Sequence, residues 1–239
     1  MKEINLLDQY PRSKRPIEER GAKKLAVAQY TTKIAGRPNS EIYFESLLLE
    51  KVREFGKEYF DGDRLYGYGG YQYDPRYWSE TVRRLRDHYK LSDSASILDV
   101  GCAKGFMLYD FKKIMPQAKI AGIDISQYAY EMAPSEVKSY IKVGNAKELP
   151  YPDKSFDLVV SINTVDHLQR SDCERAICEI QRVSKQHAFV TVNAWRSEIK
   201  KEKMLKWNIT ALTCMHVDEW KSLFDKAGYT KDYYWFLTS

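Results

Sequence analysis

Features that would place a protein in a specialised class are scarce in this sequence. Only 4 of the 239 residues are cysteines, and no two form a Cys-x-x-Cys pair, so we expect a reduced, cytoplasmic protein without a disulfide framework. No apolar run approaches the roughly 18 residues of a membrane-spanning helix. The first residues also lack the apolar core of a secretory signal. We therefore expect no membrane partner.

The composition is that of an ordinary globular protein. Apolar residues make up 44% of the chain and charged residues 30%, which excludes wholesale disorder. The length suits one domain with additional segments.

The positive charge is concentrated near the N-terminus. Residues 1–40 contain nine Lys or Arg and four Asp or Glu, whereas the remainder contains 29 of each sign. Such an arm could contact an anionic partner or a neighbouring subunit in a homo-oligomer. A solvated leader is the alternative interpretation.

Three segments are distinguishable along the chain. We expect a basic helical arm at 1–58, an aromatic-glycine lid at 59–78, and an α/β domain with a doubly wound, mostly parallel sheet at 79–239. In this last segment the apolar pattern predicts helices at 79–89, 106–115, 172–183 and 217–227, and strands at 96–100, 119–123, 142–143, 156–162, 188–193 and 229–237.

The most specific signal is a strand, a small-residue turn and a helix. The strand 97–100 leads into a turn from Gly101 to Gly105, where the backbone can approach a ligand closely. Asp124 ends the next strand, 19 residues after Gly105. A carboxylate at that position can accept hydrogen bonds from both hydroxyls of a ribose.

Two cofactors compete for this turn. The dinucleotide fingerprint Gly-x-Gly-x-x-Gly fails, because the small residues are Gly101, Ala103 and Gly105, and Phe106 follows. Asp99 would repel a pyrophosphate and attract an ammonium or sulfonium group. The charge pattern therefore favours S-adenosylmethionine, with a purely structural turn as the alternative.

With these motifs, the segment from about 96 to 236 resembles the class I S-adenosylmethionine-dependent methyltransferases. Further motifs match at 122–124, 144–146, 149–150, 156–160 and 182–183. With the aromatic-glycine segment included, the whole chain resembles small bacterial methyltransferases that are loosely associated with surface-glycan or nucleotide-sugar genes. The resemblance implies a Rossmann-like methyltransferase fold. It assigns cofactor binding to Asp99, Gly101, Ala103, Gly105, Asp124, Ile125, Asn145, Ala146 and Asn163.

The sequence departs from the family at three places. Ala103 stands where glycine is usual, which is tolerable if its φ is negative. Asn145 stands where aspartate is common, and its side-chain oxygen can still accept from an adenine amino group. One of the usual seven strands is either missing or formed by a segment such as 211–215.

The aromatic-glycine segment 59–78 contains eight aromatic residues and four glycines, which is typical of neither a helix nor a central strand. We expect a lid in which Tyr68 and Tyr71 wall the cofactor and substrate. Arg64 and Arg76 are expected to hold an anionic group. A structural strap is the alternative. The segment has a net charge of −1, so a nucleic-acid groove is not expected.

His167, after the strand 156–162, is the expected general base, and Asp166 is expected to orient or replace it. Capping by Asp166 and packing of His167 are the alternative. Arg196 is expected to bind an anionic acceptor. The four histidines and four cysteines lack paired ligand spacing, so no metal is expected. Cys102 lies at a helix N-terminus in the cofactor turn, where we expect packing rather than catalysis.

These patterns together predict an enzyme that uses S-adenosylmethionine to methylate oxygen or nitrogen of a small polar acceptor. A sugar or nucleotide-sugar is the acceptor that the resemblance favours. Methylation of RNA or protein is a second hypothesis, which only the basic arm supports. A non-catalytic cofactor-binding module is a third, kept open by Ala103, Asn145 and the short C-terminus.

Overall fold

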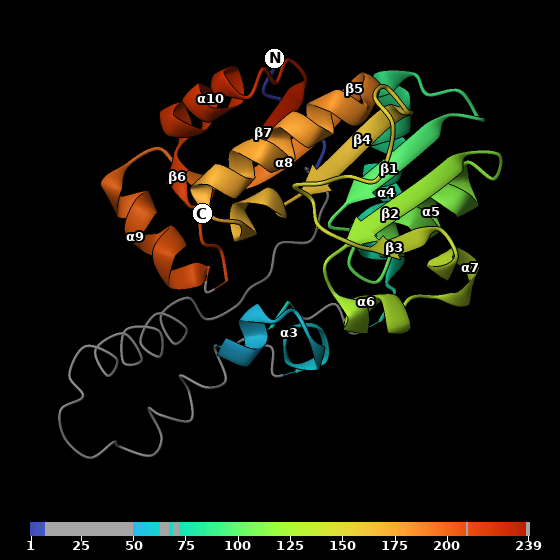
Figure 1. Ribbon diagram of the computed structural model, residues 1–239, viewed down its shortest axis with the longest axis horizontal. Coiled ribbons are helices and arrows are strands. Elements are labelled where there is room, and N and C mark those ends of the chain that lie inside the picture. Colours follow the sequence, from blue (N-terminus) through green and yellow to red (C-terminus); the bar gives the residue numbers. More distant parts are fainter. Residues whose placement is uncertain (8–49, 63–66, 69–71, 209, 238–239) are drawn as a thin grey trace.

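The computed structural model describes residues 1–7, 50–62, 67–68, 72–208 and 210–237. In these ranges helices flank one sheet (Figure 1). The helices are α3 (Lys57–Asp61), α4 (Pro75–Tyr89), α5 (Phe106–Ile114), α6 (Gln127–Glu131), α7 (Ser135–Lys138), the 3-10 turn η1 (Val165–His167), α8 (Arg170–Val183), α9 (Glu198–Trp207) and α10 (Val217–Lys226). Among the described residues, no helix is both long and apolar enough to cross a bilayer.

The sheet confirms the expected α/β architecture. Its order is β3-β2-β1-β4-β5-β6, with β7 also paired to β5, and every strand pairing in the described ranges is parallel. The strands are β1 (Ser96–Val100), β2 (Lys119–Asp124), β3 (Ile141–Val143), β4 (Phe156–Ile162), β5 (Ser184–Trp195), β6 (Met215–His216) and β7 (Asp232–Phe236). The strand order reverses between β1 and β4, and ligands of open α/β sheets bind at the carboxyl ends of strands at such a point.

Both faces of the sheet are buried, which explains its apolar strands. In β4, Val159 packs toward α8 and α10, whereas its neighbours Leu158 and Val160 pack toward α4 and α5. Side chains alternate between faces along a strand, so a strand covered on both sides reads as a continuous apolar run.

Several element boundaries differ from the sequence-based expectation. Strand β5 begins at Ser184 rather than at 188. Its first positions include exposed polar residues such as Lys185 and Gln186, so the apolar pattern did not predict them as part of the strand. The seventh strand, β6, is present as two residues at the end of the segment suggested for it.

The expectation of a loop throughout 59–78 is wrong at both ends. Helix α3 includes Tyr59, Phe60 and Asp61, and α4 begins at Pro75. Proline suits the first turn of a helix, and the carboxylate of Asp74 caps it by accepting from the backbone N–H of Arg76.

The start of the chain lies along β7. The backbone N–H of Ile4 donates to the carbonyl of Tyr233 at 2.9 Å, and the N–H of Tyr233 donates to the carbonyl of Lys2 at 3.0 Å. Residues 2–4 are therefore extended rather than helical, and they cover an edge that would otherwise expose unpaired backbone groups. Residues 8–49 of the expected helical arm lie outside the described residues.

Helix α3 lies at the carboxyl ends of the central strands, beside α6 (Figure 1). The hydroxyl of Ser126, which caps α6, donates to the carbonyl of Phe55 at 2.5 Å. A segment far from β2 in sequence is thereby placed next to the residues that follow it.

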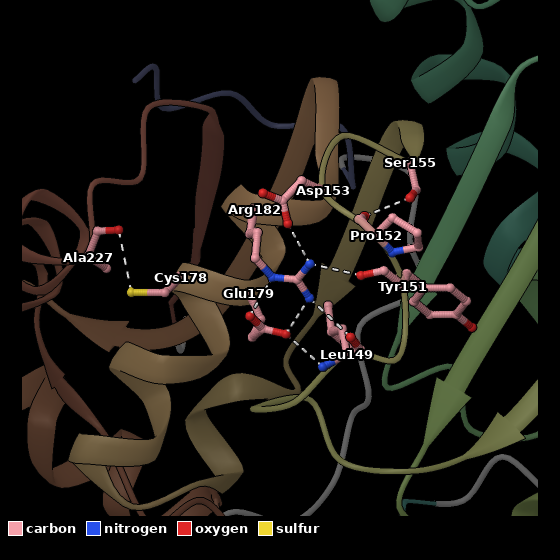
Figure 2. Close-up of polar contacts among 9 residues, drawn as sticks. All are labelled: Leu149, Tyr151, Pro152, Asp153, Ser155, Cys178, Glu179, Arg182 and Ala227. Atoms are coloured by element: carbon pink, nitrogen blue, oxygen red, sulfur yellow. Dashed lines mark hydrogen bonds and ion pairs between the residues drawn. The ribbon is translucent and has the colours of Figure 1, made fainter.

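One arginine fixes the loop between β3 and β4. The guanidinium of Arg182, on α8, binds both carboxylate oxygens of Glu179 at 2.7 Å and donates to the carbonyls of Leu149 and Tyr151 (Figure 2). It also pairs with Asp153 at 2.8 Å. This loop continues from residues expected to contact the cofactor, so Arg182 supports the site indirectly.

We predict that Arg182→Lys destabilises the protein by about 1–3 kcal/mol, because lysine cannot reproduce a planar set of donors to two carbonyls and two carboxylates. Urea unfolding measures the change. The matched control is Arg175→Lys on the same helix, where an exposed arginine makes an ion pair at 3.8 Å. Its effect should stay within about 0.5 kcal/mol, and equal effects of both changes would contradict the assignment.

Candidate cofactor and catalytic site

The turn between β1 and α5 has an unusual backbone. Gly101, Ala103 and Gly105 all have positive φ, at 81°, 51° and 75°. A Cβ on Gly101 would collide with the side chain of Thr164, and one on Gly105 would lie 2.6 Å from Cδ1 of Ile141. Glycine at these two positions therefore serves both the backbone conformation and close packing.

Ala103 does not have the negative φ under which its replacement of glycine was expected to be tolerated. Its φ of 51° is left-handed, which costs a residue with a Cβ about 1–2 kcal/mol. Its backbone N–H donates to Oδ2 of Asp124 at 2.7 Å. This charge-assisted hydrogen bond offsets part of the strain and ties the turn to β2.

Two carboxyl groups lie at the carboxyl ends of neighbouring strands. Asp99, in β1, is 4% exposed, and Asp124 ends β2. Burial raises the pKa of Asp99 well above its ordinary value, and the charge of Asp124 raises it further. Both groups therefore favour a positively charged ligand over an anionic one.

Asp124 is held by backbone amides and retains acceptor capacity. Besides the N–H of Ala103, the N–H of Ser126 donates to its Oδ1 at 2.9 Å. Burial raises the pKa of Asp124, while these amides and the nearby His167 oppose that rise. Each oxygen has a second lone pair, so the carboxylate can still accept from two ligand hydroxyls.

The remaining expected cofactor residues after β2 and β3 are placed less directly. Ile125 is 54% exposed, which leaves an apolar surface beside Asp124. Ala146 is partly buried against the core. The side-chain oxygen of Asn145 accepts from the backbone N–H of Lys147 at 3.1 Å, so it already serves its own loop and has one remaining acceptor position.

Asn163 follows β4, and its side chain is turned back toward β5. Its φ is 49°, and its Oδ1 accepts from the hydroxyl of Thr191 at 2.8 Å. In the described contacts, the side chain of Asn163 therefore stabilises the loop that follows β4. Thr164, the next residue, packs against Gly101 and brings this loop to the cofactor turn.

Asp166 does not orient His167 in the way the sequence suggested. It is fully buried, and its Oδ2 accepts a short hydrogen bond from the side-chain amide of Asn193. Its carbonyl accepts from the N–H groups of Leu212 and Thr213 at 3.1 and 3.0 Å. Asp166 therefore anchors η1 to β5 through Oδ2 of its side chain and to the segment before β6 through its backbone carbonyl.

His167 lies at the same end of the sheet as the carboxyl pair. Its ring meets the rings of Phe55 and Tyr59 edge to face, with centroids 5.5 and 6.5 Å apart. Its Nδ1 is buried and has no hydrogen-bond partner among the described residues. A buried nitrogen without a partner is costly, so this position suits a group that exchanges a proton with a ligand.

Aromatic residues of the expected lid pack on one another beside His167. Tyr68 stacks on Tyr59 with centroids 6.0 Å apart, and its backbone N–H donates to the carbonyl of Tyr59 at 2.6 Å. Tyr73 instead donates its hydroxyl to Asp110 on α5 at 2.7 Å. The segment is thus attached to the domain at Tyr73, while Tyr68 stacks on the same tyrosine ring, Tyr59, that contacts His167. Tyr71 lies outside the described residues.

The arginines expected to bind an acceptor are not gathered at the site. Arg76 is 78% exposed and bound to Asp74 at 2.5 Å, and Arg196 pairs with Glu3 at 2.8 Å. Both guanidinium groups therefore already have carboxylate partners within the chain. Arg64 lies outside the described residues.

Three residues that the sequence did not single out join the site together. Lys104, in the cofactor turn, is 2% exposed, and its Nζ donates to Oδ1 of Asp61 at 2.5 Å. The hydroxyl of Tyr128 donates to Oδ2 of the same carboxylate at 2.6 Å. The sequence places these residues in three separate segments, so no spacing rule could have found them.

Burial raises the pKa of the Cys102 thiol well above its ordinary value, which fits packing and opposes nucleophilic use. No group of three metal-binding side chains is found among the described residues.

Comparisons with known proteins bear on this geometry. Residues 98–192 match the family model described as a methyltransferase domain. Ajmaline N-methyltransferase of Rauvolfia serpentina is 39% identical over 105 residues, which are 41% of this chain and 35% of that protein. Demethylmenaquinone methyltransferase of Symbiobacterium thermophilum is 36% identical over 120 residues, 45% of each chain. The chain thus spans less than half the length of either relative.

Solved structures support the fold. The [4+2]-cyclase SpnF aligns with a TM-score of 0.54 and 22% identity, over 77% of this chain and 67% of that one. At this identity the alignment shows similarity of fold alone.

We predict that Asp99→Asn stabilises the ligand-free protein and weakens binding of S-adenosylmethionine, the expected cofactor. Because the folded-state pKa of Asp99 is raised, its ionisation costs stability as the pH rises above the unfolded value. The variant should therefore melt at a higher temperature at pH 8, and this difference should shrink at pH 5.

Calorimetry should show at least tenfold weaker binding of the cationic cofactor to Asp99→Asn. The matched control is Asp93→Asn, at an exposed position shortly before β1, which should change neither quantity. A lower melting temperature at pH 8 together with unchanged cofactor affinity would show that the charge of Asp99 has no such role.

Proposed function

The chain belongs to the class I S-adenosylmethionine-dependent methyltransferases, and from that premise we propose that it methylates an oxygen or nitrogen atom of a small polar acceptor. The observation that carries the proposal is the pair of carboxyl groups, the buried Asp99 and the half-buried Asp124, beside a turn of left-handed backbone. A site with this charge suits a sulfonium and an ammonium group.

The residues present fit this cofactor. The left-handed turn at Gly101, Ala103 and Gly105 lies beside Asp124, which has acceptor capacity for ribose hydroxyls. Ile125 offers an exposed apolar side chain where an adenine ring can pack. When bound, S-adenosylmethionine supplies an electrophilic methyl group on a positively charged sulfur.

His167 is the side chain best placed to accept the acceptor's proton. The charge of its imidazole lowers the pKa of Asp124, so the ring is close enough to Asp124 for an electrostatic interaction. The rings of Phe55 and Tyr59 cover one side of it and exclude water there. Asp166 acts as a positioning residue, because its contacts with Asn193, Leu212 and Thr213 fix the backbone that carries His167.

The acceptor is proposed to be small, polar and largely uncharged. Two of the three arginines expected to hold an anion, Arg76 and Arg196, are paired with carboxylates. This favours the sugar over the nucleotide-sugar among the acceptors that the resemblance suggested. The names of the two curated relatives point to different acceptors, an alkaloid and a quinone, so they do not select one.

Turnover of methyl-labelled S-adenosylmethionine tests the proposal. The purified full chain is offered, in parallel, a small-molecule fraction enriched in sugars and amines, total RNA, and a mixture of proteins. We predict label transfer and formation of the demethylated cofactor in the first sample. Label in RNA or protein would instead support the macromolecular alternative, and tight cofactor binding without product in any sample would support a binding module.

We predict that His167→Gln lowers kcat by about a hundredfold or more, since general-base catalysis contributes roughly 10²–10⁴-fold. The cofactor dissociation constant should change less than threefold, because the amide keeps the size of the side chain.

The matched control is His88→Gln. That histidine lies near the end of α4 and contacts Tyr89 and Asp232, away from the carboxyl ends of the strands. Its replacement should leave kcat unchanged. A loss of tenfold or less for His167→Gln would mean that the imidazole only positions the acceptor.

A further inference from the structure

Asp61 joins the three segments that enclose the proposed cofactor. It is the last residue of α3, and its carboxylate accepts hydrogen bonds from the ammonium of Lys104 and the hydroxyl of Tyr128. Lys104 lies in the turn that follows Asp99, and Tyr128 lies on α6 just after Asp124. The side chain of Asp61 thus connects α3 to the turn after β1 and to helix α6 after β2, which follow the strands that contain Asp99 and Asp124.

The ammonium of Lys104 needs this carboxylate. Its side chain is 2% exposed, and a buried charge that loses its partner is strongly unfavourable. The Asp61 carboxylate also raises the pKa of the Tyr128 phenol to about 12 by accepting its hydrogen bond. Detachment of α3 would therefore disturb the cofactor turn and α6 together.

The same docking supplies the aromatic side of the catalytic loop. Phe55 and Tyr59 meet His167 edge to face, and Phe60 stacks near Tyr128 with centroids 6.5 Å apart. The carbonyl of Phe55 accepts from the hydroxyl of Ser126. The residues around Asp61 thus contact both Ser126, just after Asp124, and His167, the proposed base.

We propose that Asp61 is a positioning residue for the methyl donor, acting through Lys104 and Tyr128 to couple the docking of α3 to cofactor binding. The inference rests on the proposed function, because it assumes that the turn 101–105 holds S-adenosylmethionine. By linkage, a cofactor that binds better when α3 is docked must also stabilise the docked state.

The charge of Lys104 gives the proposal a specific signature. S-adenosylmethionine carries one more positive charge than its demethylated thioether, S-adenosylhomocysteine. Without Asp61, the ammonium of Lys104 lacks this carboxylate and competes with the sulfonium for the carboxylates of Asp99 and Asp124. Loss of Asp61 must therefore weaken the cationic cofactor more than the neutral-sulfur product.

Calorimetric titration of the full chain with both compounds tests this signature. For Asp61→Asn we expect at least tenfold weaker binding of S-adenosylmethionine and at most threefold weaker binding of S-adenosylhomocysteine. The double variant Asp61→Asn with Lys104→Met should restore the wild-type ratio, because no ammonium is left to compete. The matched control is Glu54→Gln, which removes an exposed acidic charge just before α3 and should change neither constant.

Trypsin cleavage after the exposed Lys57, at the start of α3, reports docking directly. We expect S-adenosylmethionine to slow cleavage of the wild type at least fivefold, and Asp61→Asn to be cleaved faster with no such protection. Tyr128→Phe removes only the phenolic hydroxyl and keeps the ring, so it is a milder variant if Asp61→Asn fails to fold. It should speed cleavage and weaken the cofactor about three- to tenfold.

The outcomes separate the two hypotheses. If the wild type binds both compounds and the Asp61 and Tyr128 variants match it in affinity and cleavage, the coupling is refuted and the proposed function stands. Equal weakening of both compounds that Lys104→Met does not reverse would refute the charge-based role and leave a structural one. Binding of neither compound by the wild type would refute the proposed function and the coupling with it.

Discussion

The structure around the carboxyl ends of β1 and β2 depends on one electrostatic constraint, the placement of the buried Asp99 near the half-buried Asp124. The charge of Asp124 disfavours ionisation of Asp99, and Asp124 itself accepts hydrogen bonds from the backbone amides of Ala103 and Ser126. Such an arrangement stores unfavourable energy that a cationic ligand relieves. The left-handed φ of Ala103 belongs to the same arrangement, because that backbone points its N–H at Asp124.

The constraint explains why the site needs support from remote parts of the chain. The Arg182 contacts fix the loop after β3, and the Asp166 contacts fix the loop after β4. Asp61 then closes the side formed by the cofactor turn and α6. The Arg182 guanidinium binds carbonyls and carboxylates, the Asp166 carboxylate accepts from the Asn193 amide, and the Asp61 carboxylate accepts from Lys104 and Tyr128. Binding energy for a ligand is therefore spent on contacts instead of on ordering loops.

The sequence predicted the parts of this arrangement that local patterns determine. The apolar runs predicted both ends of β1 and both ends of β4 correctly, and the small residues from Gly101 to Gly105 indicated the turn. The side-chain partners of Asp166, Asn163 and Arg196 were not predictable, because Asn193, Thr191 and Glu3 come from segments that only the fold brings near. The two-residue strand β6 was too short for any periodicity to show.

The same distinction separates the fold from the reaction. A structure with this fold is described as a cyclase, so the sheet alone does not require methyl transfer. The carboxyl pair argues for binding a cationic cofactor, but binding alone would not need a buried imidazole nitrogen that lacks a hydrogen-bond partner in the described part of the chain. His167 has such a nitrogen at the carboxyl edge, covered by Phe55 and Tyr59. Because a binding module would gain stability by satisfying or replacing that nitrogen, its presence favours chemistry over storage of the cofactor.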